Sequence, residues 1–462
     1  MEAYLEKLLS QIRCKKARPY ILDEIRGHIE CQIEDNLAAG MDYEEAQKHA
    51  VEDMGDPVEV GVSLDKIHRP RFAWQLIAVA GVLSLLGIII QLSVFNKAVQ
   101  SDLELYLQES YRSTLISFVS AVIMGFILMS VIYFIDYTVL AKYSKIICLG
   151  ILALAMLRHT GFFGGVVNGS YHSIGFGMFR ISLTSLMMFY VPFYGAILYK
   201  YKGGGVFALI KACIWLILPV IVTFRLPNIV VTGIIMVSMV IQLSTAIIKG
   251  WFRVSVKKAL AWVWGAFAVL PAAALFVMYK CRLLAAYQIA RIDAILDASG
   301  DASYFTTMLR NLRTNIQAVG DSGNDIIGSL LPDFNSDYIF IYILNSYGFI
   351  AGIAICAVLA VLVMFVFGAA IKQKNELGMV MGFGCGMILL MNVVINVLSA
   401  VGVLPPASTF LPFLSVGRSN ILLCYGLMGL VMSIYRYKDV YPKNVKASQV
   451  AIEKKVKFTI KI

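Results

Sequence analysis

The chain has 462 residues, of which 59% are apolar and 15% charged, and its formal net charge is +11. A soluble globular domain carries nearer a quarter charged residues. This composition therefore excludes a water-soluble enzyme of this length, a disordered chain and a disulfide scaffold, and we expect a polytopic membrane protein. The positive charge does not indicate nucleic acid, because membrane proteins collect Lys and Arg in their cytoplasmic loops.

Residues 1–70 differ from the rest of the chain, since they hold 15 acidic and 9 basic side chains. Asp42 followed by Glu45 resembles a capping box, and Asp56-Pro57 places a capping acid before a proline. The predicted helices span 2–14, 19–39, about 42–55 and about 56–67. We expect a small cytoplasmic helical module with no catalytic constellation, which serves docking, regulation or cover of the cytoplasmic face.

Ten apolar segments follow the module, and several are near the 20 residues that cross a bilayer as a helix. They lie at roughly 72–94, 115–135, 144–158, 181–199, 205–223, 229–248, 259–279, 338–370, 379–401 and 418–435. The third is short, and the eighth is long enough to include a partial turn at the membrane interface. The predicted fold is all-α, with about ten transmembrane helices.

Charge predicts the orientation of these spans. With the N-terminus in the cytoplasm, the inward loops and the tail carry 18 Lys and Arg, and the outward loops carry 11. Five of those 11 lie in one long loop, and long loops count little in the positive-inside rule. We expect a module at 1–70, a ten-span membrane domain at 71–437 and a basic cytoplasmic tail at 438–462.

The long outward loop at 280–337 is well beyond an ordinary connection, and loops of that length are usually functional. Ala285, Ile289, Ile292 and Leu296 fall at helical spacing. This pattern predicts an amphipathic helix that lies on the outer membrane surface or against the bundle.

Asp337 is the first candidate for chemistry, because it stands where this loop enters the eighth span. A partly desolvated carboxylate at such a junction can be tuned toward a general base. The alternative is structural: Ser336 or Asp337 caps the first turn of the span.

Polar residues near the ends of the last spans are further candidates. Asn345 and Asn396 lie inside apolar segments, where an amide either faces a functional interior or bonds a neighbouring helix. The proline-rich loop at 402–420 is either a re-entrant turn or a cavity wall with Ser415 and Arg418 pointing inward. Arg418 either binds a phosphate or extends its charge to the membrane interface.

No cofactor is evident in the sequence. The eight cysteines are scattered without a CxxC pair, and His159 and His172 share no ligand spacing. Asn168-Gly169 by itself indicates only a turn. A bound divalent cation stays an alternative, although the sequence shows no metal-binding motif.

Four stretches resemble the SEDS family of bacterial cell-wall synthesis, the FtsW/RodA/SpoVE proteins. They are LPDFNSDYIFIYILNSYGFIAG (331–352), NVLSAVGVLPPASTFLPFLSVGRSNIL (396–422), AYQIARIDAIL (286–296) and NGSYHSIGFG (168–177). Their order and spacing and the ten predicted spans fit that family over residues 72–437. The acidic prefix lies outside this core and resembles the helical permease-prefix module of other bacterial membrane proteins.

The resemblance implies a peptidoglycan glycosyltransferase that polymerises lipid II at the outer face of the bacterial cytoplasmic membrane. The essential aspartate of the family falls on Asp337, which would deprotonate the attacking sugar hydroxyl. The implied substrate-binding residues are Arg291, Asn396, Ser415, Arg418 and Asn168. The implied partners are lipid II, membrane lipids and a class B penicillin-binding protein, which is a transpeptidase, with no nucleic acid.

The sequence also departs from the family pattern. The two glutamates that follow the family aspartate are Asn345 and Ser346 here, and the charges of the fourth span are absent from Ser182 to Met188. These losses leave two alternatives open. One is a flippase for a lipid-linked precursor, and the other is a non-catalytic scaffold that binds a transpeptidase.

Overall fold

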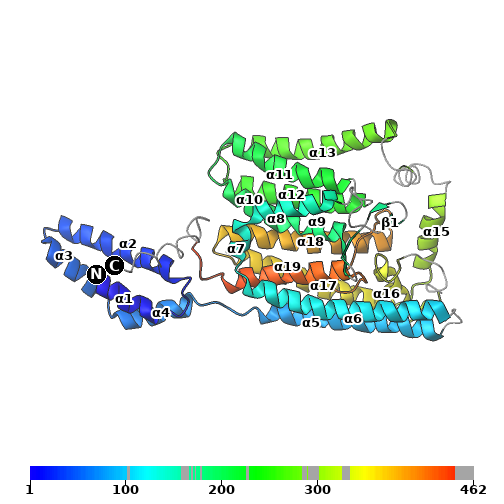
Figure 1. The fold of residues 1–462 in the computed structure, drawn as a ribbon, viewed down its shortest axis with the longest axis horizontal. Coiled ribbons are helices and arrows are strands. Elements are labelled where there is room, and N and C mark those ends of the chain that lie inside the picture. Colours follow the sequence, from blue (N-terminus) through cyan, green and yellow to red (C-terminus); the bar gives the residue numbers. More distant parts are fainter. Residues whose placement is uncertain are drawn as a thin grey trace.

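The structure is a computed structural model that describes most of the chain. The described residues are 1–100, 105–157, 166–167, 170–171, 173–176, 179–224, 228–282, 289, 301–324 and 333–442. Figure 1 shows two parts: a small group of helices that contains the N-terminus, and a long bundle whose helices run roughly parallel to one another.

The N-terminal module consists of four helices, as the sequence predicts: α1 (Glu2–Gln11), α2 (Arg18–Ala38), α3 (Tyr43–Asp53) and α4 (Pro57–Ile67). Leu5, Leu8, Ile21 and Ile29 are buried in its core. The Asp56 side chain accepts hydrogen bonds from the backbone N–H groups of residues 58 and 59, which confirms the predicted cap of α4. Helix α3 begins after Asp42, but the Asp42 side chain makes no capping bond, so the capping box is wrong in that detail.

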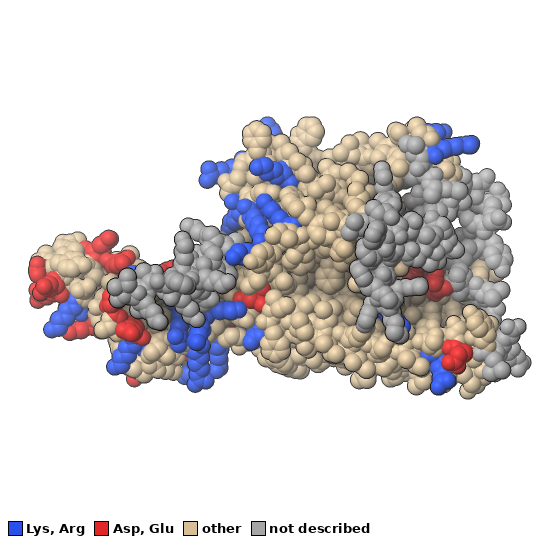
Figure 2. All heavy atoms as spheres, in the orientation of Figure 1, with Lys and Arg blue, Asp and Glu red and all other residues tan. Residues whose placement is uncertain are grey.

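Eight helices in the described part of the chain are long and apolar enough to cross a membrane. They are α5 (Trp74–Gln100), α6 (Leu105–Phe134), α11 (Val206–Phe224), α12 (Ile229–Ile248), α13 (Val256–Lys280), α17 (Phe349–Ile371), α18 (Glu376–Val401) and α19 (Arg418–Arg436). The space-filling view shows a largely uncharged surface along the middle of this bundle, with Lys, Arg, Asp and Glu gathered on the module and near the bundle ends (Figure 2).

The other two predicted spans are shorter helices. The segment 144–158 contains α8 (Ser144–Leu157), and the segment 181–199 contains α9 (Leu183–Met188) and α10 (Tyr190–Lys200), which are separated at Phe189. Every predicted apolar segment is therefore largely helical, but eight rather than ten contain a helix of spanning length.

Helices α12, α18 and α19 are largely buried inside the bundle, whereas α5 and α6 lie along one edge and α13 lies at the periphery (Figure 1). Small residues allow the closest approaches. A Cβ on Gly125 of α6 would lie 2.0 Å from the ring of Tyr425 on α19, and one on Gly429 would lie 2.8 Å from the Met129 carbonyl oxygen. Close backbone approach at small residues is typical of helix packing in membranes.

The long eighth segment is divided into α16 (Ile339–Tyr347) and α17 at Gly348, which has a φ of +87°. A Cβ there would lie 2.6 Å from the Ala318 carbonyl oxygen, so glycine is required by both conformation and space. The backbone N–H groups of Phe349 and Ile350 donate to the carbonyls of Gln317 and Ala318. Residues 317 and 318 of the segment before α16 thus pack against this break, whose position was not predicted from the sequence.

Shorter elements complete the two ends of the bundle. At the end far from the module lie α15 (Asp301–Arg313) and two hairpins, β1 (Val166–Val167) with β2 (Ser170–Tyr171) and β3 (Ser173–Phe176) with β4 (Phe179–Ser182). In the second hairpin Ser173 pairs with Ser182. The predicted amphipathic helix around 285–296 lies outside the described residues except for Ile289, whereas α15 was not predicted.

The module contacts the near end of the bundle, and we call the cluster around Asp136 the module junction. Lys16 Nζ lies 2.6 Å from Asp136 Oδ2, and the Tyr441 hydroxyl donates to the same oxygen. Lys16 also lies over the ring of Tyr437, and the rings of Tyr20 and Tyr441 meet edge to face. Asp136 in turn caps α7 (Tyr137–Lys142). The junction therefore joins the module, the loop after α6 and the segment after α19.

Candidate active site

A cavity of about 650 Å³ opens at the end of the bundle far from the module. Its size is within the range of small-molecule sites. Hydroxyl and amide side chains dominate its described lining, and the charged residues there are Asp337 and Arg418. The lining residues are Ser173, Ser182, Thr184, Met188, Asn228, Val231, Asp337, Asn392, Ser408, Thr409, Phe410, Gly417, Arg418, Ser419 and Asn420.

Asp337 is half-buried in the turn that precedes α16. The turn is closed by the Asp333 carbonyl, which accepts hydrogen bonds from the N–H groups of Ser336 (3.0 Å) and Tyr338 (3.2 Å). Helix α16 has Tyr338 as its N-cap residue and no side-chain capping bond. Asp337 therefore lies one residue before the capping position, so the capping alternative for Ser336 or Asp337 is wrong, and the carboxylate side chain lines the cavity.

A second irregular segment, residues 402–417, packs against this turn. The Ser415 hydroxyl donates to the Ser336 carbonyl (2.7 Å), and the Ser336 hydroxyl donates to the Val416 carbonyl (2.7 Å). The Val416 N–H donates to the Asn335 carbonyl (3.0 Å). These reciprocal bonds hold two segments together that lie about 80 residues apart in the chain.

Asn396 on α18 fixes the backbone of Asp337 itself. Its Nδ2 donates to the Asp337 carbonyl (2.7 Å) and to the Thr409 carbonyl (3.0 Å). The side chain is 2% exposed. Because the amide joins both irregular segments to a buried helix, it orients the carboxylate without contact with the cavity.

Two predicted substrate-binding residues therefore lie behind the cavity. Asn396 and Ser415 are both buried and neither lines it. The Ser415 hydroxyl also accepts a hydrogen bond from the Leu411 N–H (2.8 Å). The cavity-wall alternative therefore does not hold for Ser415, because its hydroxyl is held by backbone donors and acceptors that must be satisfied where water is excluded.

Arg418 lines the cavity, which agrees with the cavity-wall alternative for this residue, and it is the first residue of α19. Its side chain is exposed, and Nε donates to the Ser117 hydroxyl on α6 (2.6 Å). The guanidinium therefore stands at the rim, where a charged ligand group could reach it. Arg291 and Asn168, the other two predicted substrate contacts, lie outside the described residues.

Several lining residues were not identified from the sequence. Asn228 caps α12 through the Val231 N–H (3.2 Å) and donates to the Ser408 carbonyl (2.9 Å). Asn420 accepts from the Ser185 hydroxyl (2.6 Å). Asn228 could have been found from the sequence, because a polar residue at the start of a predicted span is a candidate cap. The position of Asn420 on the cavity side of α19 is set by packing.

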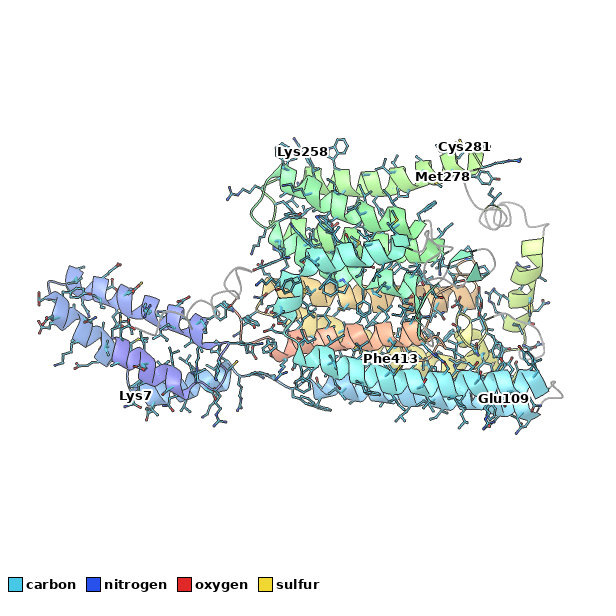
Figure 3. The ribbon with its side chains drawn as sticks, viewed as in Figure 1. Lys7, Glu109, Lys258, Met278, Cys281 and Phe413 are labelled. Carbon is cyan, nitrogen blue, oxygen red and sulfur yellow. The ribbon has the colours of Figure 1, made fainter. Side chains whose placement is uncertain are left out.

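Non-polar packing holds the segment 402–417 against the bundle, at residues that do not themselves line the cavity. Phe413, labelled in Figure 3, lies in the interior of the bundle, where its ring meets Tyr425 edge to face at 5.0 Å. Its backbone has a φ of +67°, and its carbonyl lies 2.3 Å from where a Cβ on Gly87 would be. Gly87 therefore lets the re-entrant segment approach α5, which fixes the back of the site.

The described residues offer little for a metal ion. Nowhere in the described ranges do three His, Cys, Asp or Glu side chains form a group that could hold one. The described cavity lining contains a single carboxylate, Asp337. A divalent cation would have only hydroxyl and amide oxygens as further protein ligands there.

The fold and sequence match known proteins. A TM-score of 0.63 at 18% identity relates 80% of this chain to 98% of a chain from the structure "Structural coordination of polymerization and crosslinking by a peptidoglycan synthase complex". The rod shape determining protein RodA of Thermus thermophilus gives a TM-score of 0.54 at 15% identity, over 79% of this chain and 97% of RodA.

Curated relatives match a shorter region. The probable peptidoglycan glycosyltransferase FtsW of Borreliella burgdorferi is 28% identical over 170 residues, which are 36% of this chain and 45% of that protein. The peptidoglycan glycosyltransferase MrdB of Escherichia coli is 27% identical over 198 residues, 40% of this chain and 52% of MrdB. The chain thus spans about half the length of these two relatives.

The match to a family covers far more of the chain. Residues 73–440 match the FtsW/RodA/SpoVE family, which is described as cell cycle protein. The module helices α1 to α4 lie before the matched region, and the cavity, Asp337 and both irregular segments lie within it. The chain is therefore a multi-pass membrane protein that belongs to the FtsW/RodA/SpoVE family, with a helical module before the family domain.

Proposed function

We propose that this protein is a peptidoglycan glycosyltransferase that polymerises lipid II. The observation that carries the proposal is the half-buried carboxylate of Asp337, oriented by a buried amide and facing a polar cavity at one end of a membrane bundle. The names of the relatives, peptidoglycan glycosyltransferases FtsW and MrdB, support the same reaction.

The orientation we propose places the module in the cytoplasm and the cavity at the outer face. Cationic side chains gather at the module end of the bundle (Figure 2). They lie at or just after the ends of α7, α10 and α12 and at the start of α8: Lys142, Lys145, Lys200, Lys202, Lys249 and Arg253. Positive loops stay in the cytoplasm during insertion. Both the N-terminal module and the segment after α19 lie at this end, so both termini would be cytoplasmic (Figure 1).

The cavity residues divide the reaction between them. Asp337 accepts the proton of the attacking sugar hydroxyl as its oxygen forms a bond to the anomeric carbon of the donor sugar. The bond between that carbon and the lipid pyrophosphate oxygen breaks, and the electron pair leaves with the pyrophosphate. Arg418 at the rim is placed to stabilise this departing anion, because a guanidinium binds phosphate oxygens with paired hydrogen bonds.

No step is assigned to a divalent cation. The described lining supplies one carboxylate, and that carboxylate is needed as a base. Mg²⁺ in protein sites is usually held by one or two carboxylates together with waters and substrate phosphates. A cation held mainly by the pyrophosphate of the substrate would be compatible with this cavity.

A transpeptidase partner is supported by the structural comparison. One related structure is that of a peptidoglycan synthase complex, and it concerns the coordination of polymerization and crosslinking. We propose that a class B penicillin-binding protein joins this chain in a similar complex, and that membrane lipids surround the apolar faces of its helices.

Polymerisation of purified lipid II by the purified protein, with and without a partner transpeptidase, tests the proposed function. We expect glycan chains to form and the partner to increase their yield. If no polymer forms in either condition, the enzyme proposal is wrong. Transbilayer movement of lipid II in protein-containing vesicles would then indicate a flippase, and its absence a scaffold.

The orientation has its own test. A cysteine introduced at Gly320, in the described part of the outward loop, should react in intact cells with a thiol reagent that cannot cross the membrane. A cysteine at Gly203, in the turn after α10, should react only after lysis. The opposite pattern would reverse the proposed topology.

A further inference from the structure

Asn392 is a fully buried amide in the wall of the cavity. It lies on α18, is 0% exposed and is one of the lining residues. Its Nδ2 donates to the Ile388 carbonyl (2.9 Å) and lies 3.6 Å from Met188 Sδ. Among the described residues its Oδ1 has no hydrogen-bond partner. A buried amide oxygen without a donor is costly, typically about 1–3 kcal/mol, so it needs an explanation.

The orientation of this amide follows from its neighbour. The carbonyl of Ile388 can only accept a hydrogen bond, so the nitrogen of the amide must face it and the oxygen must face away. From this orientation we infer that Oδ1 is the amide atom on the cavity side, where the lining also includes the apolar residues Met188 and Val231. Neither side chain can donate a hydrogen bond to Oδ1.

Asn392 also has a defined position relative to Asp337. Asn396, which holds the Asp337 carbonyl, is four residues further along the same helix. Residues four apart share one face of a helix and are about 6 Å apart along its axis. Since α18 runs toward the cavity end, Asn392 lies about one turn deeper than the residue that orients Asp337 (Figure 1).

We propose that Asn392 is a specificity-determining residue, whose Oδ1 accepts a hydrogen bond from an N–H or O–H group of the sugar bound against Asp337. This inference rests on the function proposed above and names a contact within that site. An amide oxygen repels phosphate oxygens, so the pyrophosphate is placed toward Arg418 and the sugar toward Asn392. A substrate that lacks the matching group would leave the buried oxygen of the site without a hydrogen bond. This cost is the strongest source of discrimination between similar ligands.

Gln242 on α12 provides a matched control. It too is 0% exposed, its Nε2 donates to the Val380 carbonyl (3.0 Å), and its Oε1 has no partner among the described residues. It is not one of the residues that line the cavity. Asn392→Leu and Gln242→Met each remove a buried amide of nearly the same volume, and only the first removes an acceptor that faces the cavity.

The experiment measures the dissociation constant of purified lipid II in protein that carries Asp337→Asn, so that turnover does not consume the substrate. We expect Asn392→Leu to weaken binding about tenfold, since a lost hydrogen bond of this kind is about that large. Gln242→Met should leave binding within about twofold, and Asn392→Gln, which keeps the acceptor, should restore part of the loss.

Substrate analogues identify the group that Asn392 recognises. Lipid II analogues that each lack one sugar hydroxyl, or whose acetamido N–H is methylated, are titrated into the same proteins. One analogue should bind about tenfold more weakly to protein with Asn392, and its defect should disappear with Asn392→Leu, because the two changes remove the same bond. If Asn392→Leu does not fold, the analogue series in protein with Asn392 decides alone: no weakened analogue means no such contact.

The outcomes separate the two proposals. Equal binding of lipid II with and without Asn392→Leu overturns this inference and leaves the enzyme proposal intact. A loss that Gln242→Met reproduces also overturns it, since the effect then belongs to buried amides in general. If the parent protein binds no lipid II and the wild type forms no polymer, the proposed function and the inference fail together.

Discussion

Two aspartates at opposite ends of the bundle, Asp136 and Asp337, each stand in a turn before a short helix, and their surroundings differ. The Asp136 side chain is 4% exposed and accepts hydrogen bonds from the Thr138 N–H and hydroxyl (both 2.9 Å), from Lys16 Nζ (2.6 Å) and from the Tyr441 hydroxyl. Asp337 is half-buried and lines a cavity, its backbone carbonyl accepts a hydrogen bond from Asn396 (2.7 Å), and the Ser336 hydroxyl lies 3.5 Å from its Oδ1.

The difference distinguishes an aspartate with a structural role, Asp136, from one with a proposed catalytic role, Asp337. The carboxylate of Asp136 is surrounded by donors from three segments, so its role is to hold those segments together. At Asp337 the scaffold fixes the backbone and leaves the carboxylate at the wall of a cavity large enough for a substrate. The same substitution, aspartate to asparagine, should therefore affect activity at one end and stability at the other.

The largest expected effect is on turnover. Asp337→Asn keeps the size and hydrogen-bonding capacity of the side chain but removes its basicity. General base catalysis typically contributes about 10²–10⁴ in rate, so lipid II polymerisation should fall by that factor. The midpoint of thermal unfolding in detergent should stay within about one degree, because the backbone contacts of residue 337 remain.

Asp333 supplies the control for this prediction. It lies in the same turn and is exposed, with a φ of +56° that asparagine also tolerates. Asp333→Asn should therefore leave polymerisation unchanged. Wild-type activity in Asp337→Asn, or an equal loss in both variants, would contradict a special role for Asp337 and move the scaffold alternative ahead.

The second effect is on stability at the module junction. Asp136→Asn keeps an oxygen that can cap α7 but removes the negative charge that pairs with Lys16. Because Lys16 is two-fifths exposed, its charge is not stranded in the interior, so we expect a loss of about 2 kcal/mol rather than the 3–5 kcal/mol of a fully buried pair. Thermal unfolding should shift downward while polymerisation per folded molecule stays unchanged.

The sequence predicts the helices well because each depends on local pattern. The ten apolar segments, the cap at Asp56 and the excess length of the eighth segment follow from composition, capping residues and helix length. The prefix of 70 residues is recognised by its charge alone. In each case the information lies within one continuous stretch of the chain.

The parts that depend on tertiary contacts were missed. Lys16, Asp136 and Tyr441 form the junction, and they are separated by more than 100 and 300 residues. The direction of Ser415 depends on where the turn at 333–338 lies, since only that turn supplies its acceptor. Asn392 and Asn396 are both amides in one apolar run, and only the packed structure shows which of them lines the cavity.

The third effect sharpens the role of backbone positioning at Asp337. Asn396→Leu removes the donor to the Asp337 carbonyl without a change to the cavity lining. Small errors in the placement of a catalytic group reduce rate more than binding, so we expect the turnover number to fall about tenfold with the KM for lipid II nearly unchanged. Asn396→Gln, which keeps a donor, should recover part of the rate. A rise in KM without a fall in turnover would instead make Asn396 a substrate contact, as the family resemblance implies.

The smallest effect concerns pH at the module junction. Burial by itself lowers the pKa of Lys16, but the hydrogen bond and the charge of Asp136 raise it more, so its pKa lies above the ordinary value of 10.5. Burial raises the pKa of Tyr441, and the charge of Asp136 raises it further. A group whose pKa is raised on folding stabilises the folded state fully below its unfolded pKa, and this contribution is lost as pH rises through the folded value. The junction should therefore be intact at neutral pH and weaken above about pH 10.5.

Lys16→Gln measures that contribution directly. Because the side chain is two-fifths exposed and solvent screens the pair, we expect a loss of about 0.5–1 kcal/mol at pH 7. Between pH 7 and 9 the difference in unfolding free energy between wild type and variant should be constant, since Lys16 is fully protonated in both folded and unfolded chains. Above pH 10.5 the two stability curves should converge, because the wild type then loses the charge that the variant never had. A difference that persists at higher pH would assign the effect of Lys16 to its contact with the Tyr437 ring and its aliphatic packing rather than to its ion pair with Asp136.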